Sequence, residues 1–166
     1  MSLYLNPPTW LPPLLPFPGD WPAYESAVYS VFDRDFVRHR PVLLGKPVAV
    51  KSGPPDRGRE YGFWHLIEEE QAGGRVPDIR RCERIAWPRA LVETAPGNAI
   101  GWRNTRTSKH GRNHRNLVVA LPDFSYVVVL REHPRYFVLW TTYCVEFAHR
   151  RAKCEAECRT PGARAF

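Results

Sequence analysis

The stretch from Asn116 to Val145 reads NLVVALPDFSYVVVLREHPRYFVLWTTYCV and decides the fold. It holds three runs rich in Val, Leu, Tyr and Phe, separated by Pro122-Asp123 and by His133-Pro134. Turn residues between runs of β-formers are typical of an antiparallel meander. We therefore expect three consecutive antiparallel strands in this part of the chain.

The last of these runs includes Thr141 and Tyr143, two hydroxyl side chains that are two residues apart. Successive side chains of a strand point to opposite faces, so strict alternation places both hydroxyls on one face, together with Phe137 and Leu139. The other face would carry Tyr136, Val138, Trp140 and Thr142. If the strand end opens on a groove, the two hydroxyls can donate hydrogen bonds to a ligand there.

Composition favours one domain with a polyanionic partner. The 166 residues suffice for a single sizeable core, and a net charge of +7 favours nucleic acid. No segment is long and apolar enough to span a bilayer, and prolines interrupt the first 20 residues where an export signal would lie, so we expect a cytoplasmic protein without a membrane partner. The cysteines lack CxxC spacing and predict neither a metal site nor disulfides; they are Cys82, Cys144, Cys154 and Cys158. We expect no cofactor.

The order of the patterns predicts an α+β domain. Residues 1–20 are proline-rich and suit an extended strap, either wrapped on the fold or serving as a docking arm for a partner. Asp20 and Asp78 can each cap a helix. Residues 21–158 would form the domain, ending in a helix from Glu146 to Cys158, and residues 159–166 a tail.

A basic segment from Trp102 to Asn116, WRNTRTSKHGRNHRN, has five Lys or Arg and no acidic residue. Read as a loop, it offers fixed donors and backbone amides that a phosphate backbone exploits, although such charge runs are often only solvated. The predicted nucleic-acid contacts are Arg103, Arg106, Arg112, His114 and Arg115. Outward arginines on the helix after Asp78 could extend this surface.

RNA supplies its own nucleophile, the 2'-hydroxyl, so its cleavage requires only a base, an acid and cations for the developing charge. His65, in the run YGFWHLIEEE that we interpret as a strand, can act as base or acid, unless it is only a core histidine. The complement would be His110 or His114. Lys109 would hold the phosphate together with Arg103 and Arg106, while Thr141 and Tyr143 orient phosphate or base. The absence of clustered carboxylates argues against a two-metal nuclease.

Several short motifs together resemble the phage-associated branch of the barnase, EndoU, colicin and RelE ribonuclease superfamily. They are F-W-H-L at 63–66, R-C-x-R-I-x-W at 81–87, Y-V-V-V-L at 126–130, L-W-T-T-Y at 139–143 and H-R-R at 149–151. The resemblance covers roughly Tyr61 to Lys153. It implies N-terminal helices on a curved antiparallel sheet and metal-independent cleavage of RNA, often tRNA or mRNA, by toxins or effectors. It also implies that His65 is a catalytic histidine and that Thr141 and Tyr143 are the hydroxyl pair of the last strand.

The expected function is therefore a metal-independent endoribonuclease, toxin-like or phage-encoded, that leaves a 2',3'-cyclic phosphate. RNA is the expected partner, and an antitoxin, immunity or host protein is a further candidate. Two rivals remain. One is a catalytically silent nucleic-acid-binding or virion-associated protein, and the other is a module that binds a host protein through the proline-rich arm.

Overall fold

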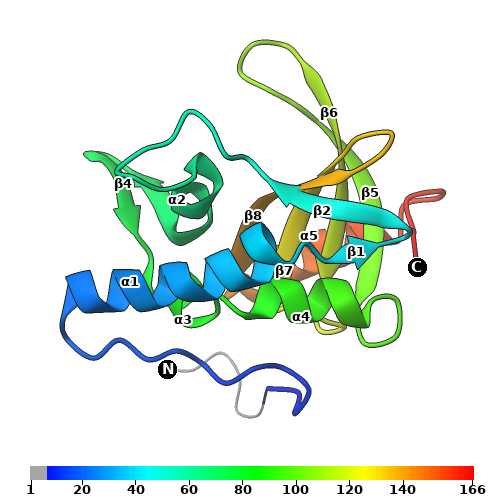
Figure 1. Cartoon of the computed structure of the whole chain (residues 1–166). Helices are drawn as coiled ribbons and strands as arrows, with labels where there is room; N and C mark the ends of the chain where they lie inside the picture. Colours follow the sequence, from blue (N-terminus) through cyan, green and yellow to red (C-terminus); the bar gives the residue numbers. More distant parts are fainter. Residues whose placement is uncertain (1–6) are drawn as a thin grey trace.

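The computed structural model describes residues 7–166, which form a six-stranded sheet, a two-stranded hairpin and five α-helices. In chain order the elements are α1 (Trp21–Phe32), a π-helical turn (Asp33–Arg38), β1 (Val42–Leu43), β2 (Lys46–Val50), α2 (Tyr61–Ile67), β3 (Glu68–Gln71), β4 (Gly74–Pro77), α3 (Ile79–Glu83), α4 (Trp87–Thr94), β5 (Ile100–Thr107), β6 (Asn113–Ala120), β7 (Tyr126–Glu132), β8 (Phe137–Cys144) and α5 (Ala148–Cys158). In Figure 1, α1 runs from the left towards the middle of the domain, and α4 lies below β1 and β2. The predicted α+β class is confirmed.

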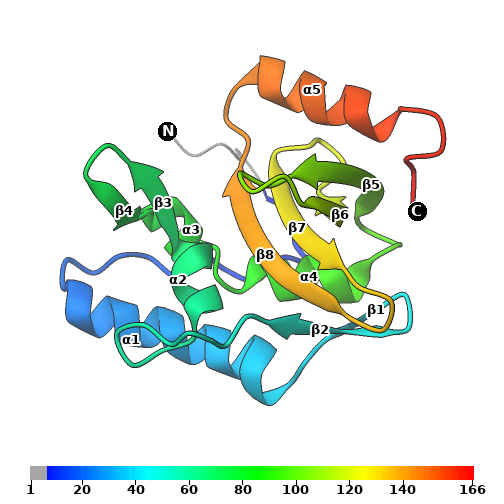
Figure 2. The same cartoon turned by 90° about the horizontal axis from the view of Figure 1, so that it is seen from above.

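The predicted meander forms the centre of the large sheet. Strands lie in the order β1-β2-β8-β7-β6-β5, and the sheet is strongly curled (Figure 2). The pairs β5–β6, β6–β7 and β7–β8 are antiparallel, as expected, whereas β2 joins β8 in parallel. The separate hairpin of β3 and β4 lies beyond α2.

The main core lies on the face of the sheet that α1, α2 and α4 cover. Helix α1 contributes Tyr24, Val28 and Phe32, which are all buried. Trp87 of α4 packs edge-on against Tyr126 of β7, with ring centroids 5.2 Å apart. Aromatic pairs of this kind add to the stabilisation from burial alone. Because the helices cover this face of the sheet, its opposite face points away from the main core.

A β-bulge in β8 changes the alternation expected from the sequence. Val129 of β7 pairs with Thr141, but its neighbour Leu130 pairs with Leu139, so Trp140 is the extra residue. Leu139 and Phe137 therefore belong to the main core. Thr141 and Tyr143 do share a face, as predicted, but placing Phe137 and Leu139 with them was wrong.

Two further local predictions were wrong. The YGFWHLI segment forms helix α2 rather than a strand, because its buried residues Phe63, Leu66 and Ile67 have helical spacing. The basic segment is not a loop. It forms β5 and β6 of a hairpin whose tight turn has Gly111 in the left-handed region at φ 74°.

Both ends of the described chain lie against the domain. In the strap, the carbonyl of Pro12 accepts a hydrogen bond from Trp87 Nε1 at 2.9 Å, and the Leu15 amide donates to the Glu83 carbonyl at 2.9 Å. At the other end, the Arg103 amide donates to the Ala163 carbonyl at 2.8 Å, which covers the edge of β5. The first six residues of the predicted strap lie outside the described residues. Within residues 7–166, no helix has the length and apolar composition that crossing a bilayer requires.

Candidate nucleic-acid groove

The second face of the sheet is only partly covered. Helix α5 packs over one end of it, where Trp102, Val118 and Val127 form a small second core with Cys158. The rest of this face forms an open groove of about 230 Å³. We call this the sheet groove, and its lining residues are Asn104, Arg106, His114, Asn116, Val118, Val129, Arg131, Trp140, Thr141, Tyr143 and Glu157.

The strand register brings the polar residues of the sheet groove together. Arg106 of β5 lies opposite His114 of β6, and Asn104 lies opposite Asn116, whose amide donates to Asn104 Oδ1 at 3.1 Å. Directly opposed side chains of paired strands lie close enough to interact. The sheet groove is thus built from residues far apart in the sequence, on four neighbouring strands.

Arg131 of β7 is the most unusual residue of the sheet groove. Its guanidinium carbon lies 3.3 Å from the centroid of the Trp140 ring. Its Nε is buried without a hydrogen-bond partner, and within residues 7–166 no carboxylate forms an ion pair with it. Burial lowers the pKa of Arg131, since desolvation disfavours the charged form. A half-buried positive charge without a counterion is costly unless an anion binds there.

The pKa values of two titratable groups in the sheet groove are shifted in opposite directions. Partial burial and the nearby charges of Arg131, Arg112 and His133 lower the pKa of His114, so its imidazole is neutral at pH 7. Burial raises the pKa of Tyr143 to about 12, which keeps its hydroxyl protonated. A neutral imidazole can accept a proton and a phenol can donate one.

Glu157 of α5 closes one end of the sheet groove. Its carboxylate accepts hydrogen bonds from Trp102 Nε1 at 2.8 Å and from Asn104 Nδ2 at 3.1 Å, and it pairs with Arg106. Burial acts to raise the pKa of Glu157, but these three donors outweigh it and lower the pKa. Arg106 is therefore compensated, whereas Arg131 is not.

His65 lies in a different pocket from the two hydroxyls. Its ring packs against Trp140, with centroids 4.9 Å apart, and it lines a hollow with Tyr61, Arg75 and other residues of the α2 region. Burial and the charge of Arg75 lower the pKa of His65, and its Nδ1 is buried without a hydrogen-bond partner in the described part of the chain. Trp140 lines the sheet groove, whereas His65 does not. The structure therefore does not bring His65 into one pocket with Thr141 and Tyr143.

The predicted nucleic-acid contacts, together with the predicted catalytic residues Lys109 and His110, separate into three groups. Arg106 and His114 line the sheet groove. Arg103 and Arg115 instead bind Glu132, at 2.8 and 3.2 Å, in an ion-pair cluster outside the sheet groove. Three exposed residues lie at or beside the turn between β5 and β6, and these are Lys109, His110 and Arg112.

Sequence reasoning missed Arg131, Asn104, Asn116 and Glu157 as members of the site. Arg131 was detectable, because it follows the YVVVL run two residues after Val129 and so shares the face of Val129. Glu157 was not detectable from the sequence, because it comes close to Arg106 only when α5 packs on the sheet.

The chain thus defines an α+β domain with a polar, cationic groove across one face of a curled sheet. Among residues 7–166 no three His, Cys, Asp or Glu side chains gather as a metal site would require, and the cysteines are free thiols. No family model, curated protein or solved structure gives a significant match to this chain.

Proposed function

We propose that the sheet groove binds single-stranded RNA and cleaves it by transesterification, without a metal ion. The observation that carries this proposal is Arg131, a half-buried cation without an ion-pair partner among the described residues, beside His114, Thr141 and Tyr143. A phosphate would supply the missing counterion. Groups with shifted pKa values gathered in a groove are typical of functional sites.

In the proposed reaction, neutral His114 takes the proton of the 2'-hydroxyl, and the 2'-oxygen forms a bond to phosphorus. The bond from phosphorus to the 5'-oxygen breaks, and Tyr143 gives its proton to the leaving oxygen. Arg131 stabilises the negative charge that develops on the non-bridging oxygens, and Thr141 orients the phosphate. The products are a 2',3'-cyclic phosphate and a free 5'-hydroxyl.

The shape of the sheet groove supports a polymeric substrate. Its volume of about 230 Å³ is smaller than the roughly 300 to 1,000 Å³ of pockets that enclose small ligands. An open surface with hydrogen-bond donors suits an extended single strand. RNA is favoured over DNA because the reaction uses the 2'-hydroxyl. We further propose, from the motif resemblance, a toxin or phage effector acting on tRNA or mRNA in a bacterial cytoplasm.

The test is incubation of the purified protein with a defined RNA in EDTA, followed by mapping of the cut ends. We expect cyclic-phosphate ends that are lost in His114→Gln and Tyr143→Phe. His39→Gln is the matched control, because His39 is exposed and outside the sheet groove. His65→Gln identifies the imidazole involved. Cleavage abolished by His65→Gln but retained by His114→Gln would refute the assignment of the chemistry to the sheet groove.

The pH profile tests the same assignment separately. Because the pKa of His114 is lowered, kcat/KM should rise with pH, and the midpoint of this rise should lie below the ordinary histidine value of 6.5. Tyr143, with a pKa of about 12, should produce no descending limb below pH 9. A bell-shaped profile centred near neutrality would instead point to two histidines.

A catalytically silent RNA-binding protein is the second candidate. One observation favours it, namely that the sheet groove contains a single imidazole, His114. In that case, RNA binding would depend on Arg131 while no cut ends appear under any condition of pH or metal.

A further inference from the structure

The sheet groove is the first of three adjoining hollows. The second, which we call the helix pocket, encloses about 240 Å³ and is lined by Arg106, Tyr143, Cys144, Val145, Arg150, Lys153, Cys154 and Glu157. The third, the end pocket, adjoins it through Tyr143, Cys144 and Arg150. Tyr143 lines all three hollows. The sheet groove and the helix pocket thus lie on two sides of the same residues, Arg106, Tyr143 and Glu157.

One face of α5 forms a wall of the helix pocket. Arg150, Lys153, Cys154 and Glu157 are spaced at i, i+3, i+4 and i+7, which places them on the same side of a helix. Glu157 is bound by Arg106. Arg150 and Lys153 are exposed, and in the described part of the chain neither forms an ion pair with a carboxylate. The helix pocket therefore has two uncompensated positive charges.

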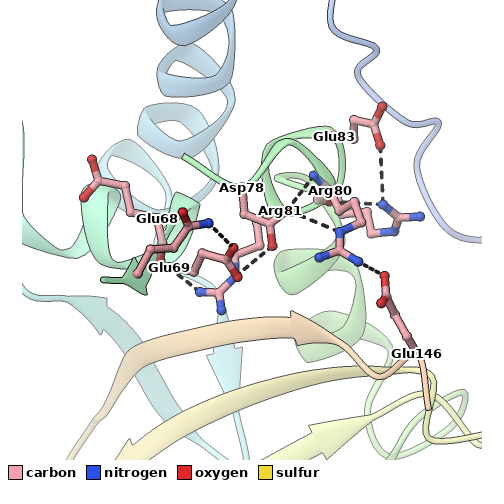
Figure 3. A network of polar contacts seen from close by, with 9 residues as sticks. Glu68, Glu69, Asp78, Arg80, Arg81, Glu83 and Glu146 are labelled. Carbon is pink, nitrogen blue, oxygen red and sulfur yellow. Dashed lines mark hydrogen bonds and ion pairs between the residues drawn. The ribbon is translucent and has the colours of Figure 1, made fainter. Parts of the chain in front are cut away.

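The end pocket, in contrast, compensates most of its charge internally. Figure 3 shows Arg80 and Arg81 gathered around Asp78, with N–O distances of 3.4 and 3.5 Å, and Arg80 reaching Glu146. These arginines are held by carboxylates. The positive charge that remains for a ligand is thus concentrated at Arg150 and Lys153.

An exposed aromatic ring adjoins these cations. Phe147 is 54% exposed, and its ring lies 5.5 Å from the guanidinium carbon of Arg150. The imidazole of His149 stacks on it at 5.6 Å with an interplanar angle of 23°. Stacking platforms beside cations are how proteins hold the bases of single strands.

We propose that the helix pocket is a second nucleotide subsite for single-stranded RNA. Arg150 and Lys153 hold the phosphate of a nucleotide next to the scissile one, and the base of that nucleotide stacks on Phe147. This inference rests on the proposed function, since the sheet groove is taken to hold the scissile phosphate. An acidic peptide would satisfy the two cations but has no reason to need the aromatic platform.

The test compares binding of a dinucleotide and a tetranucleotide, both made uncleavable by 2'-deoxy substitution, by fluorescence anisotropy. We expect the tetranucleotide to bind more tightly than the dinucleotide. The double variant Arg150→Gln/Lys153→Gln should lose this advantage and reduce the salt slope of tetranucleotide binding by about 0.7, the value for one single-strand phosphate. Phe147→Ala should weaken tetranucleotide binding about fivefold or more, at the low end of what one stacked base contributes. Arg159→Gln is the matched control, because Arg159 follows the same helix and pairs with Glu155 at 2.6 Å.

The outcomes separate the two proposals. Equal binding of both oligonucleotides, or unchanged tetranucleotide binding in all variants, overturns the second subsite even if RNA is cleaved. Effective competition by a polyglutamate peptide that also requires Phe147 overturns the assignment to RNA. Length-dependent binding that requires Arg150, Lys153 and Phe147, in a protein that cuts no RNA, supports the subsite and refutes only the cleavage.

Discussion

Replacement of Arg131 by methionine should separate stability from function. In the folded protein the guanidinium lies on Trp140 and gains a cation–π interaction of about 0.5 to 2 kcal/mol. It also bears the cost of partial desolvation with no carboxylate partner in residues 7–166. Methionine removes the charge and retains an S–aromatic contact of about 0.3 to 1.5 kcal/mol. We therefore expect the free energy of unfolding to change by less than about 1 kcal/mol, which shifts Tm by at most about 4 °C.

RNA binding and cleavage should respond differently. Loss of one phosphate contact reduces the salt slope of single-strand binding by about 0.7. Loss of a preorganised charge at the scissile phosphate should lower kcat by about 10² to 10³. The measurements are thermal unfolding, anisotropy over a range of salt concentrations, and cleavage of a defined RNA, all with the same Arg131→Met preparation.

Arg115→Met is the control for this prediction. Arg115 lies on the next strand, in the ion-pair cluster around Glu132, where Arg103 and Lys46 remain after the substitution. It should leave binding and cleavage unchanged. The reasoning is refuted if Arg131→Met lowers the free energy of unfolding by more than about 3 kcal/mol. A loss of that size is typical of a buried ion pair from which one partner has been removed. Unchanged RNA binding would refute it equally.

Three other predictions concern the fold. Leu130→Ala should cost about 2 to 5 kcal/mol in urea unfolding, because Leu130 is fully buried in the main core. In the folded protein the pKa values of Glu132 and Glu157 are lowered below the ordinary 4.5. The free energy of unfolding should therefore be constant above about pH 5 and should fall as the pH drops through those lowered values. Changing both residues to Gln should make this fall shallower. Gly101→Ala should destabilise the protein by about 1 to 3 kcal/mol, because a methyl group there collides with the Phe166 ring; the penalty should shrink when Phe166 is also replaced by Ala.

The sequence predicted the elements whose signals are local. Three β-rich runs with turn residues between them became β6, β7 and β8, and the cap at Asp78 accepts a hydrogen bond from the Arg80 amide at 2.9 Å. The YGFWHLI segment was ambiguous, because a short apolar run fits a buried strand or a buried helix equally well. The segment forms a helix that packs against β8, and in this helix His65 lies against the Trp140 ring.

The bulge at Trp140 explains why the hydroxyl pair was predicted and its neighbours were not. Strict alternation assigns Leu139 and Thr141 to one face, yet Leu139 is in the main core and Thr141 lines the sheet groove. One extra residue between them reverses the alternation at that point. The residue added is a tryptophan, whose ring then serves as the platform for Arg131. A single register shift thus supplies both the direction of the hydroxyls and the contact that holds the uncompensated cation, so the bulge is best understood as part of the site.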